Sequence, residues 1–386
     1  MTNKKKRWVG LIALLVAEAM NLLDATIVQV AAPVIHGELR GRTSDIQWFS
    51  AAYTLPFALL LITGGRLGDL YGRRRVFRIG VAGFVAASTT CALAMDPVVL
   101  IGARAVQGVA AAVVIPQTIG LIKTSFEGPE LSKALGCIGP VMGLAGLSGP
   151  LLGGVLTEAI SWRAVFLVNV PLGLAVLALA RVLPESRSPR RRNLLTIEVS
   201  LFRNSGFGAA LITSTLFFAV MSGLTLIVVL HQQLTLHHSV MHASLTLLPW
   251  SVCSGVASWC AGQWLAPRFG SRLMYVGLGL LLVAVLGANQ PIGLAVCGVG
   301  AGLFTTSFFT EALHRVQPQE TGSAAGLLNA VQQFGSTLGV VVLGTVRALW
   351  VAAAVIVVTI ATAHVMRSPR SQRLGRAEPA PARTAR

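Results

Sequence analysis

The sequence predicts an all-α polytopic membrane protein with about twelve membrane-spanning helices. Hydrophobic residues make up 54% of the 386 residues and charged residues only 12%, whereas soluble domains carry about 25% charged residues. The mean hydropathy is +0.71. Apolar runs of roughly 20 residues recur along the chain, which is the length that crosses a bilayer as a helix. These runs are continuous and do not alternate with period two, so a β-barrel is excluded.

Twelve apolar runs are candidate spans. The basic segment 1–7 leads into a run that is too long for the core of a signal peptide and contains Glu18 and Asp24, so it is interpreted as the first span. The predicted turn near 345–347, between the last two spans, is the tightest connection between consecutive spans. The runs cover approximately residues 8–33, 46–65, 76–95, 97–121, 133–157, 163–183, 206–230, 241–264, 273–289, 291–311, 321–345 and 348–366.

The basic residues support an even number of spans. If the N-terminus lies inside, only Arg40, Arg42, Arg163 and Arg347 of the 31 Lys and Arg residues fall in outside segments, and only Arg104 lies within a span. This asymmetry follows the positive-inside rule and places both termini in the cytoplasm of a cell-membrane protein. The net charge of +17 is therefore explained by topology, and we expect no nucleic-acid partner.

One long polar stretch, 184–205, divides the spans six and six. We therefore predict an N-terminal six-helix half at 1–183, a cytoplasmic linker at 184–205 and a C-terminal six-helix half at 206–366. The remaining 367–386 is rich in Arg, Pro and Ala, which predicts a disordered basic cytoplasmic tail. Two six-span repeats related by a pseudo-two-fold axis are a common plan of transporters.

A charged break at 65–75 separates the second span from the third, and five of its eleven residues are charged. It predicts a tight inside hairpin whose reversal uses Gly65 and Gly72. A weaker copy, 263–272, follows the eighth span with Leu and Gly at matching offsets. This internal repeat favours duplication of the two halves, although other helical membrane proteins also duplicate.

Three charged residues lie within spans, where charges are costly and usually functional. Asp24 is about 16 residues, roughly 24 Å, from the inside end of its helix, and Arg104 is roughly 10 Å from the outside end of its own. Both lie in the outer half, so they could meet if their helices are neighbours. Such a pair is either a structural ion pair or a carboxylate that exchanges its proton during transport. Glu18, nearer the midplane, is a proton site, a counter-charge for a cationic substrate, or a neutral buried acid.

The fifth span has a glycine-rich face that includes Gly149 and Gly153, whereas Gly154 lies off that face. Small residues on one face let helices pack closely, and Pro150 bends the helix beside it. This pattern indicates either ordinary membrane packing or a surface on which the two halves rock.

Other chemistry is not indicated. The five cysteines lie in apolar runs, where they act as small buried hydrophobes. A phosphate-binding loop and a nucleophile constellation are both missing from the sequence, so we expect neither an ATPase nor another enzyme. Four histidines occupy one outside loop with a spacing that fits no metal site, so we expect no metal. They are His231, His237, His238 and His242.

Five motifs resemble the major facilitator superfamily, and more narrowly its drug–proton antiporters that are usually given fourteen spans. The resemblance covers about residues 8–345. The motifs are a loop motif with Gly65, Asp69, Gly72, Arg73 and Arg74; a first-span motif from Leu23 to Pro33, with Gln29 where Asn is usual; a fourth-span motif with Arg104, Gln107 and Gly108; the antiporter motif with Gly149, Pro150, Gly153 and Gly154; and a sixth-span start with Trp162, Arg163, Asn169 and Pro171.

The resemblance implies a proton-coupled antiporter that exports hydrophobic or cationic drugs or antibiotics by alternating access. It implies coupling roles for Asp24 and Arg104, and a latch in which Asp69 docks on the partner half. Our candidate acceptor is the N-terminus of the helix that opens at Thr321. The expected partners are a small-molecule substrate, protons and membrane lipid. We expect a monomer whose only cofactor-like requirement is a proton gradient.

The chain departs from fourteen-span members of the family. Its linker is short where those members place two further helices, so it resembles a fourteen-span exporter reduced to twelve. Gln263 and Pro267 replace the Gly and Asp of the loop motif in the second half, which predicts a one-sided latch. An uptake symporter on the same fold is the nearest alternative, and the fifth-span motif disfavours it. A degenerate, non-transporting membrane sensor is the other.

Overall fold

The computed structural model describes residues 3–42, 44–127, 130–131, 133–134, 137–185, 205–285, 290–314, 321–343 and 348–367. The described part is almost entirely helical, which confirms the predicted all-α class. Seven of its helices are long and apolar enough to cross a membrane, judged by length and composition. Parts of the predicted linker (186–204), of the tail (368–386) and of the last turn (344–347) lie outside the described residues.

Every predicted span contains helix among its described residues. The first half contains α1 (Asn3–Leu39), α2 (Asp45–Tyr71), α3 (Arg73–Ala92), α4 (Pro97–Ser125), α6 (Ile138–Ala159), α7 (Trp162–Leu167), α8 (Asn169–Leu179) and the short η1 (Ala180–Val182). The second half contains α10 (Ser205–Leu230), η2 (His231–Thr235), α11 (Val240–Cys260), η3 (Ala261–Leu265), α12 (Ala266–Phe269), α13 (Arg272–Val285), α14 (Pro291–His314), α15 (Thr321–Leu343) and α16 (Ala348–Arg367).

Local sequence sets several helix starts. The Asp96 side chain accepts a hydrogen bond from the backbone N–H of Val99 at 2.9 Å, and Pro97 follows as the first residue of α4. Ser161 and Ser239 cap α7 and α11 in the same way. A capping oxygen satisfies a backbone N–H that has no partner within the helix, and proline is well tolerated at the first helical position.

The hairpin at 65–75 is tighter than predicted, which corrects the second-span boundary. Helix α2 continues to Tyr71, so Gly65 is helical and takes no part in the reversal. Gly72 alone joins α2 to α3, with φ 100° and ψ 125°. Charged residues such as Arg66 and Asp69 can be accommodated in the last turns of α2, where water can solvate them. The helix therefore continues beyond the apolar run. Gly270, just before α13, also has a positive φ of 53°, so the two copies turn on matching glycines.

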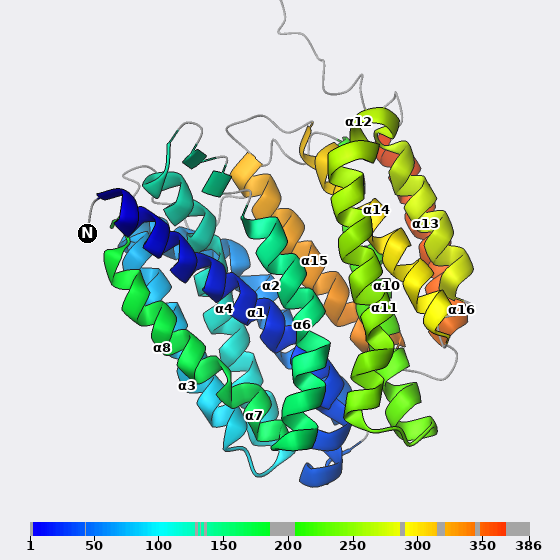
Figure 1. Ribbon diagram of the computed structural model, residues 1–386, viewed down its shortest axis with the longest axis horizontal. Helices are drawn as coiled ribbons and strands as arrows, with labels where there is room; N and C mark the ends of the chain where they lie inside the picture. Colours follow the sequence, from blue (N-terminus) through cyan, green and yellow to red (C-terminus); the bar gives the residue numbers. More distant parts are fainter. Residues whose placement is uncertain are drawn as a thin grey trace, which may run out of the picture.

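The helices of the two halves pair in the same way. In the first half α2 packs against α4, α4 against α3, α1 against α6 and α8, and α3 against α8. The corresponding pairs of the second half are α11 with α14, α14 with α13, α10 with α15 and α16, and α13 with α16. Figure 1 shows the two bundles side by side. This repeated pairing is what a pseudo-two-fold relation between the halves requires.

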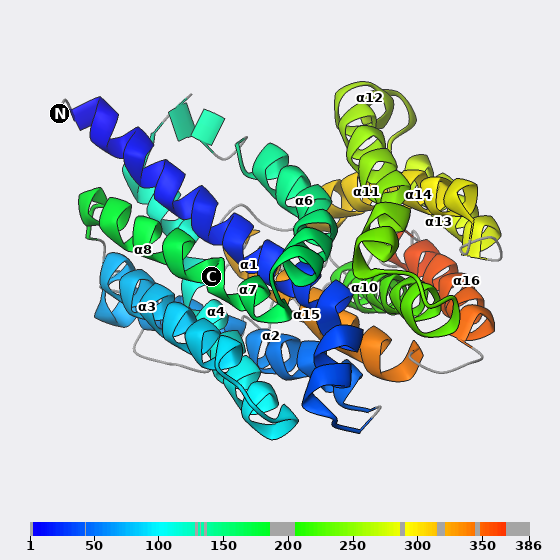
Figure 2. The same cartoon turned by 60° about the horizontal axis from the view of Figure 1, so that its bottom comes forward.

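The halves meet along two seams, which Figure 2 shows between the bundles. Helix α2 packs against α15, and α6 packs against α11. These pairs are equivalent under the same pseudo-symmetry. Large apolar side chains on the outer surface, such as Leu59, Ile79 and Val283, are exposed, as a lipid-facing surface requires.

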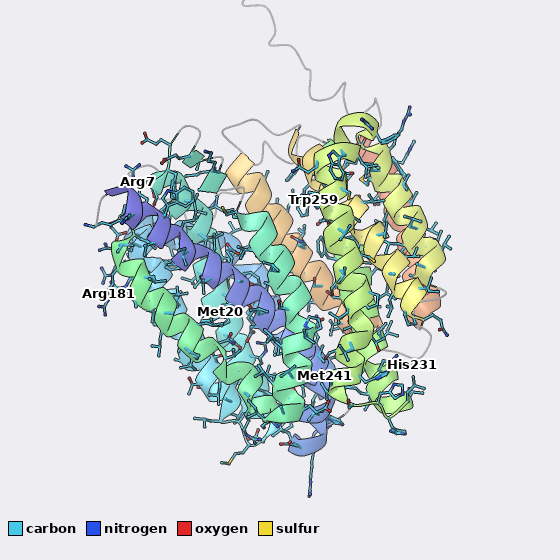
Figure 3. All side chains as sticks on the ribbon, viewed as in Figure 1. Arg7, Met20, Arg181, His231, Met241 and Trp259 are labelled. Atoms are coloured by element: carbon cyan, nitrogen blue, oxygen red, sulfur yellow. The ribbon has the colours of Figure 1, made fainter. Side chains whose placement is uncertain are left out.

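The two ends of the molecule differ in charge. Figure 3 places Arg7 and Arg181 toward one end, and His231 and Met241 toward the opposite end. The first end also carries the α2–α3 turn at Gly72, because Arg74 of this turn donates to the carbonyl of Leu183, two residues beyond Arg181. We call it the arginine end and the other the histidine end. The arginine end is the one predicted to face the cytoplasm.

Candidate functional site

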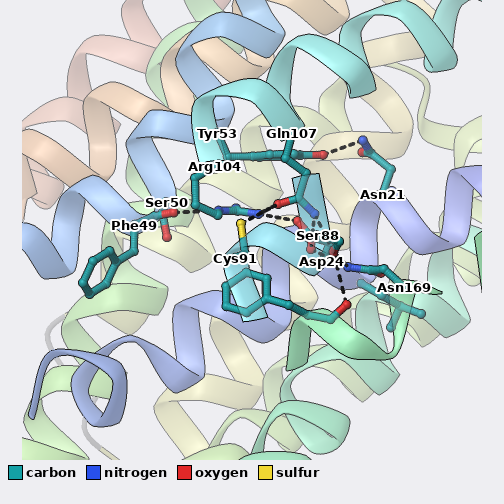
Figure 4. A network of polar contacts seen from close by, with 12 residues as sticks. Asn21, Asp24, Phe49, Ser50, Tyr53, Ser88, Cys91, Arg104, Gln107 and Asn169 are labelled. Carbon is teal, nitrogen blue, oxygen red and sulfur yellow. Dashed lines mark hydrogen bonds and ion pairs between the residues drawn. The ribbon is translucent and has the colours of Figure 1, made fainter. Parts of the chain in front are cut away.

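The structure brings Asp24 of α1 and Arg104 of α4 together. Arg104 Nη1 lies 2.5 Å from Asp24 Oδ2, and the exposed fractions of the two side chains are 1% and 0%. Figure 4 shows the pair at the centre of a polar network inside the first half. The pair is therefore closed off from solvent on every side.

Two amides complete the hydrogen bonding of the carboxylate. Gln107 Nε2 donates to Asp24 Oδ1 at 2.8 Å, and Asn169 Nδ2 donates to the same oxygen at 2.7 Å. Both amides also donate to Ser88 Oγ of α3, at 3.1 and 2.8 Å. Ser88 in turn donates to the carbonyl of Phe166 at 3.1 Å. The network thus joins α1, α3, α4, α7 and α8.

Arg104 is held by more than its counter-ion. Its Nε donates to the carbonyl of Phe49 in α2 at 2.9 Å, and its Nη1 also donates to Gln107 Oε1 at 2.7 Å. The guanidinium carbon lies 4.3 Å from the centroid of the Tyr53 ring, within cation–π range. These contacts offset part of the cost of removing a charge from water.

A break in the sixth span positions Asn169. Helix α7 ends at Leu167, and α8 begins at Asn169. Pro171 has no N–H to donate to the carbonyl of Leu167, so the helix cannot continue unchanged through this point. The sixth-span motif thereby places an amide at the carboxylate.

Glu18 has a separate partner. Its carboxylate accepts a hydrogen bond from the Thr118 hydroxyl of α4, and the oxygen of that hydroxyl also lies 2.7 Å from the carbonyl oxygen of Ile115. Glu18 and Asp24 therefore lie on the same helix but bind different residues of α4. The structure does not bring Glu18 into the Asp24 network.

The loop-motif residues bind one another and the end of η1. Asp69 Oδ1 lies 2.6 Å from Arg73 Nη2, and Arg74 Nη1 donates to the carbonyl of Leu183 at 3.0 Å. The ion pair of Asp69 in this structure is thus with Arg73. Docking of Asp69 on the N-terminus of α15 stays a prediction.

The antiporter-motif glycines face both halves. A Cβ at Gly149 would collide with Thr26 Oγ1, and one at Gly153 would lie 3.2 Å from the carbonyl oxygen of Ile27, both on α1. A Cβ at Gly154 would lie 2.5 Å from Ser244 Oγ on α11. The first two glycines therefore allow close packing within the first half, and the third allows close packing across a seam.

Further motif residues fix helix contacts. Trp162 Nε1 donates to Glu38 Oε2 at 2.7 Å, and Arg163 Nη1 lies 3.2 Å from the same oxygen. These bonds hold α7 against the end of α1. A Cβ at Gly108 would collide with the Tyr53 carbonyl oxygen, so this glycine permits the close approach of α4 and α2.

A cavity of about 160 Å³ lies between the two halves. It is bounded by helices α1, α6, α10 and α11, so that each half supplies two of them. The residues that line it are Thr26, Gln29, Gly146, Pro150, Thr225, Leu247, Trp250 and Ser251. Sequence reasoning missed the four from the second half, because no motif marks them.

Hydrogen bonds join described residues of the two halves. Thr54 Oγ1 and Thr337 Oγ1 lie 2.5 Å apart across the α2–α15 seam. Gln233 Nε2 donates to the carbonyl of Val30 at 2.9 Å, and the Met241 N–H donates to Glu158 Oε2 at 2.8 Å. The sequence did not indicate these contacts. They show that the halves are joined in the described structure.

The structure thus has two pseudo-symmetric helical halves, a cavity between them and a buried ion pair inside the first half. The model of the Major Facilitator Superfamily matches residues 14–340, and the chain belongs to that family. This confirms the family named by the sequence motifs. The chain is accordingly a multi-pass membrane protein.

The similar proteins include one named as a transporter and one named as a resistance protein. The chain is 37% identical to the "Probable actinorhodin transporter" of Streptomyces coelicolor, over 88% of this chain and 72% of that protein. It is 31% identical to the "Puromycin resistance protein pur8" of Streptomyces alboniger, over 88% and 82%. A bacterial homologue of the human lysosomal transporter Spinster has the same fold, with a TM-score of 0.76 and 17% identity over 97% of this chain and 99% of that one.

Proposed function

We propose that the chain is a proton-coupled efflux transporter of hydrophobic small molecules that works by alternating access. The sealed Asp24–Arg104 pair carries the proposal, because an ionisable group inside a membrane protein usually serves transport. Relatives named for actinorhodin transport and puromycin resistance support the outward direction.

Binding of a proton to Asp24 would weaken the contacts between α1 and its neighbouring helices. Protonation of Asp24 removes the negative charge and leaves Arg104 buried without its counter-ion, which is strongly unfavourable. The hydrogen bonds that tie α1 to α4 and α8 through Asp24 would then weaken. Because Thr26 and Gln29 of α1 line the cavity, a change at Asp24 reaches the cavity wall within one or two turns of the same helix.

The test is drug accumulation in cells that express the chain, with and without a proton uncoupler. Lower accumulation than in cells that express Asp24→Asn, abolished by the uncoupler, is the expected result. Higher accumulation of a nutrient would instead indicate an uptake symporter. Accumulation equal to that of cells expressing Asp24→Asn and unchanged by the uncoupler, at equal amounts of inserted protein, would rule out proton-coupled export and favour a sensor. Glu18→Gln, tested in parallel, shows whether the second acid is also required.

The arginine end is proposed to face the cytoplasm, in agreement with the positive-inside rule. Lys5 lies in α1 at the arginine end, and His237 lies between η2 and α11 at the histidine end; both are exposed. In a background without the five native cysteines, His237→Cys should react with an impermeant maleimide in intact cells. Lys5→Cys should react only after permeabilisation, and the reverse pattern would contradict this orientation.

A further inference from the structure

The cavity between the halves is polar but uncharged along its described lining. Its residues are hydroxyl-bearing, amide-bearing, aromatic or apolar, and Asp, Glu, Lys and Arg are missing from the described ones. Gln29, Trp250 and Ser251 are half-buried. Among the described residues, no hydrogen-bond partner is found for the amide, the indole N–H or the hydroxyl of these three. Each is therefore available to a bound molecule.

The backbone adds an acceptor. Within α6, the carbonyl of Gly146 would normally accept from the N–H of residue 150, which is Pro150 and has none. Both residues line the cavity. Thr26 and Thr225 use their hydroxyl protons on carbonyls of their own helices, at 2.9 Å in each case, and so face a ligand with free lone pairs. The wall thus offers both donors and acceptors.

The membrane-embedded charges of α1 and α4 already have partners elsewhere. Asp24 and Arg104 are sealed against each other. Glu18 is bonded to Thr118 on α4, and α4 contributes none of the described residues that line the cavity. A cation that entered the cavity would lose water and gain no counter-ion, which is costly. An uncharged molecule with hydrogen-bonding groups would meet no such cost.

We propose that this cavity binds uncharged, flat ring compounds that carry carbonyl and hydroxyl groups, and that it disfavours cations. Trp250 supplies an aromatic face for the ring, and Gln29 and Ser251 bind the oxygens. The volume of about 160 Å³ is below the roughly 300–1,000 Å³ of sites that enclose drug-sized ligands, so it holds one ring system of the substrate. This inference rests on the proposed export function and names its substrate class.

Everted vesicles from cells that express the full chain test it, with an imposed pH gradient. The probes are 1,8-dihydroxyanthraquinone, the unsubstituted anthraquinone, and the cation ethidium. Accumulation above that of uncoupler-treated vesicles is measured by extraction and absorbance, or by fluorescence. Transport is expected to be strongest for the dihydroxy compound, weaker for anthraquinone and weakest for ethidium.

Variants of the cavity tie transport to the site. Gln29→Leu and Ser251→Ala each remove one hydrogen-bonding group and should lower transport of the dihydroxy compound about twofold to tenfold. Trp250→Leu should lower transport of both ring compounds by a similar factor. Trp259→Leu, at an exposed position of the same helix, is the matched control and should leave transport unchanged. Equal transport in the cavity variants and the control would overturn the assignment.

Gln29→Glu provides a gain-of-function test, because it adds a carboxylate with almost no change of shape. This variant should gain ethidium transport and lose transport of the dihydroxy compound. Ethidium transport by the unchanged chain at a rate equal to that of the dihydroxy compound would overturn the substrate class but leave proton-coupled export standing. Absence of uncoupler-sensitive transport for all three probes would overturn both proposals.

Discussion

Removing one partner of a buried ion pair lowers the free energy of unfolding by more than the intact pair contributes to it. Single and double variants of Asp24 and Arg104 can therefore test whether the two charges depend on each other. Arg104→Gln leaves Asp24 with only the amide donors of Gln107 and Asn169. It should lower the unfolding free energy by about 3–5 kcal/mol. The double change Asp24→Asn with Arg104→Gln leaves no unpaired charge and should recover most of that loss. Thermal unfolding of the purified protein in detergent measures both.

Transport separates the two roles that the sequence left open for this pair. If Asp24 exchanges a proton, the stabilised double variant should show no uncoupler-sensitive efflux. If the pair is only structural, the double variant should export as well as the unchanged chain. Efflux by the double variant would therefore contradict the proton role even when its stability is normal.

Gly72 has a backbone conformation that residues with a side chain rarely adopt, with φ 100°. Gly72→Ala should therefore lower the unfolding free energy by about 1–3 kcal/mol. Gly83→Ala, within α3, is the matched control. Its new Cβ would lie 3.7 Å from Ala110 Cβ, so the control should be neutral or slightly stabilising. Equal melting temperatures for the two variants would contradict the strained turn.

At this scale the sequence predicted the charged pair but not its surroundings. Depth along two helices was enough to place Asp24 and Arg104 in the same layer of the membrane. Ser88 and Tyr53 could not be predicted, because a serine or tyrosine in an apolar span gives no sign of which neighbour it faces. Gln107 and Asn169 entered through the family motifs, and their hydrogen bonds to Asp24 required the structure.

At the scale of the helix, a variant of the Asp69–Arg73 pair can test transport without a large effect on stability. The two side chains are 37% and 23% exposed, and exposed pairs contribute only about 0–1 kcal/mol. Asp69→Asn should therefore leave insertion and melting temperature nearly unchanged. If Asp69 also acts as the latch, this variant should lose efflux. Normal efflux by Asp69→Asn, at equal protein levels, would exclude the latch.

Helix faces were predictable from the sequence, but the helices they contact were not. Angular position alone separated Gly154 from Gly149 and Gly153. The structure shows the reason, since Gly154 faces α11 of the other half whereas the other two glycines face α1. The hairpin boundary was wrong for a related reason. Charged residues at a helix end indicate where the apolar layer stops, and they do not indicate where the helix stops.

At the scale of the whole molecule, the Thr54–Thr337 contact offers a way to lock the two halves. Their hydroxyl oxygens lie 2.5 Å apart across the α2–α15 seam. In a background without the five native cysteines, Thr54→Cys with Thr337→Cys should form a disulfide on mild oxidation. The halves could then no longer separate at this seam, so efflux should stop and return on reduction.

The single variants Thr54→Cys and Thr337→Cys are the controls for this cross-link, and their efflux should not respond to oxidation. Mass spectrometry identifies the disulfide. Efflux that continues in the fully cross-linked protein would show that these helices need not part during transport.

The single-residue turn at Gly72 has a mechanical consequence. Helix α2 carries Thr54 at the seam between the halves, and α3 carries Ser88 in the charge network. With only one residue between the two helices, the end of α2 and the start of α3 cannot move apart. A displacement of the whole of α2 along its axis must therefore be shared by α3. Gly72 therefore links a helix of the seam to a helix that contributes Ser88 to the hydrogen bonds around Asp24.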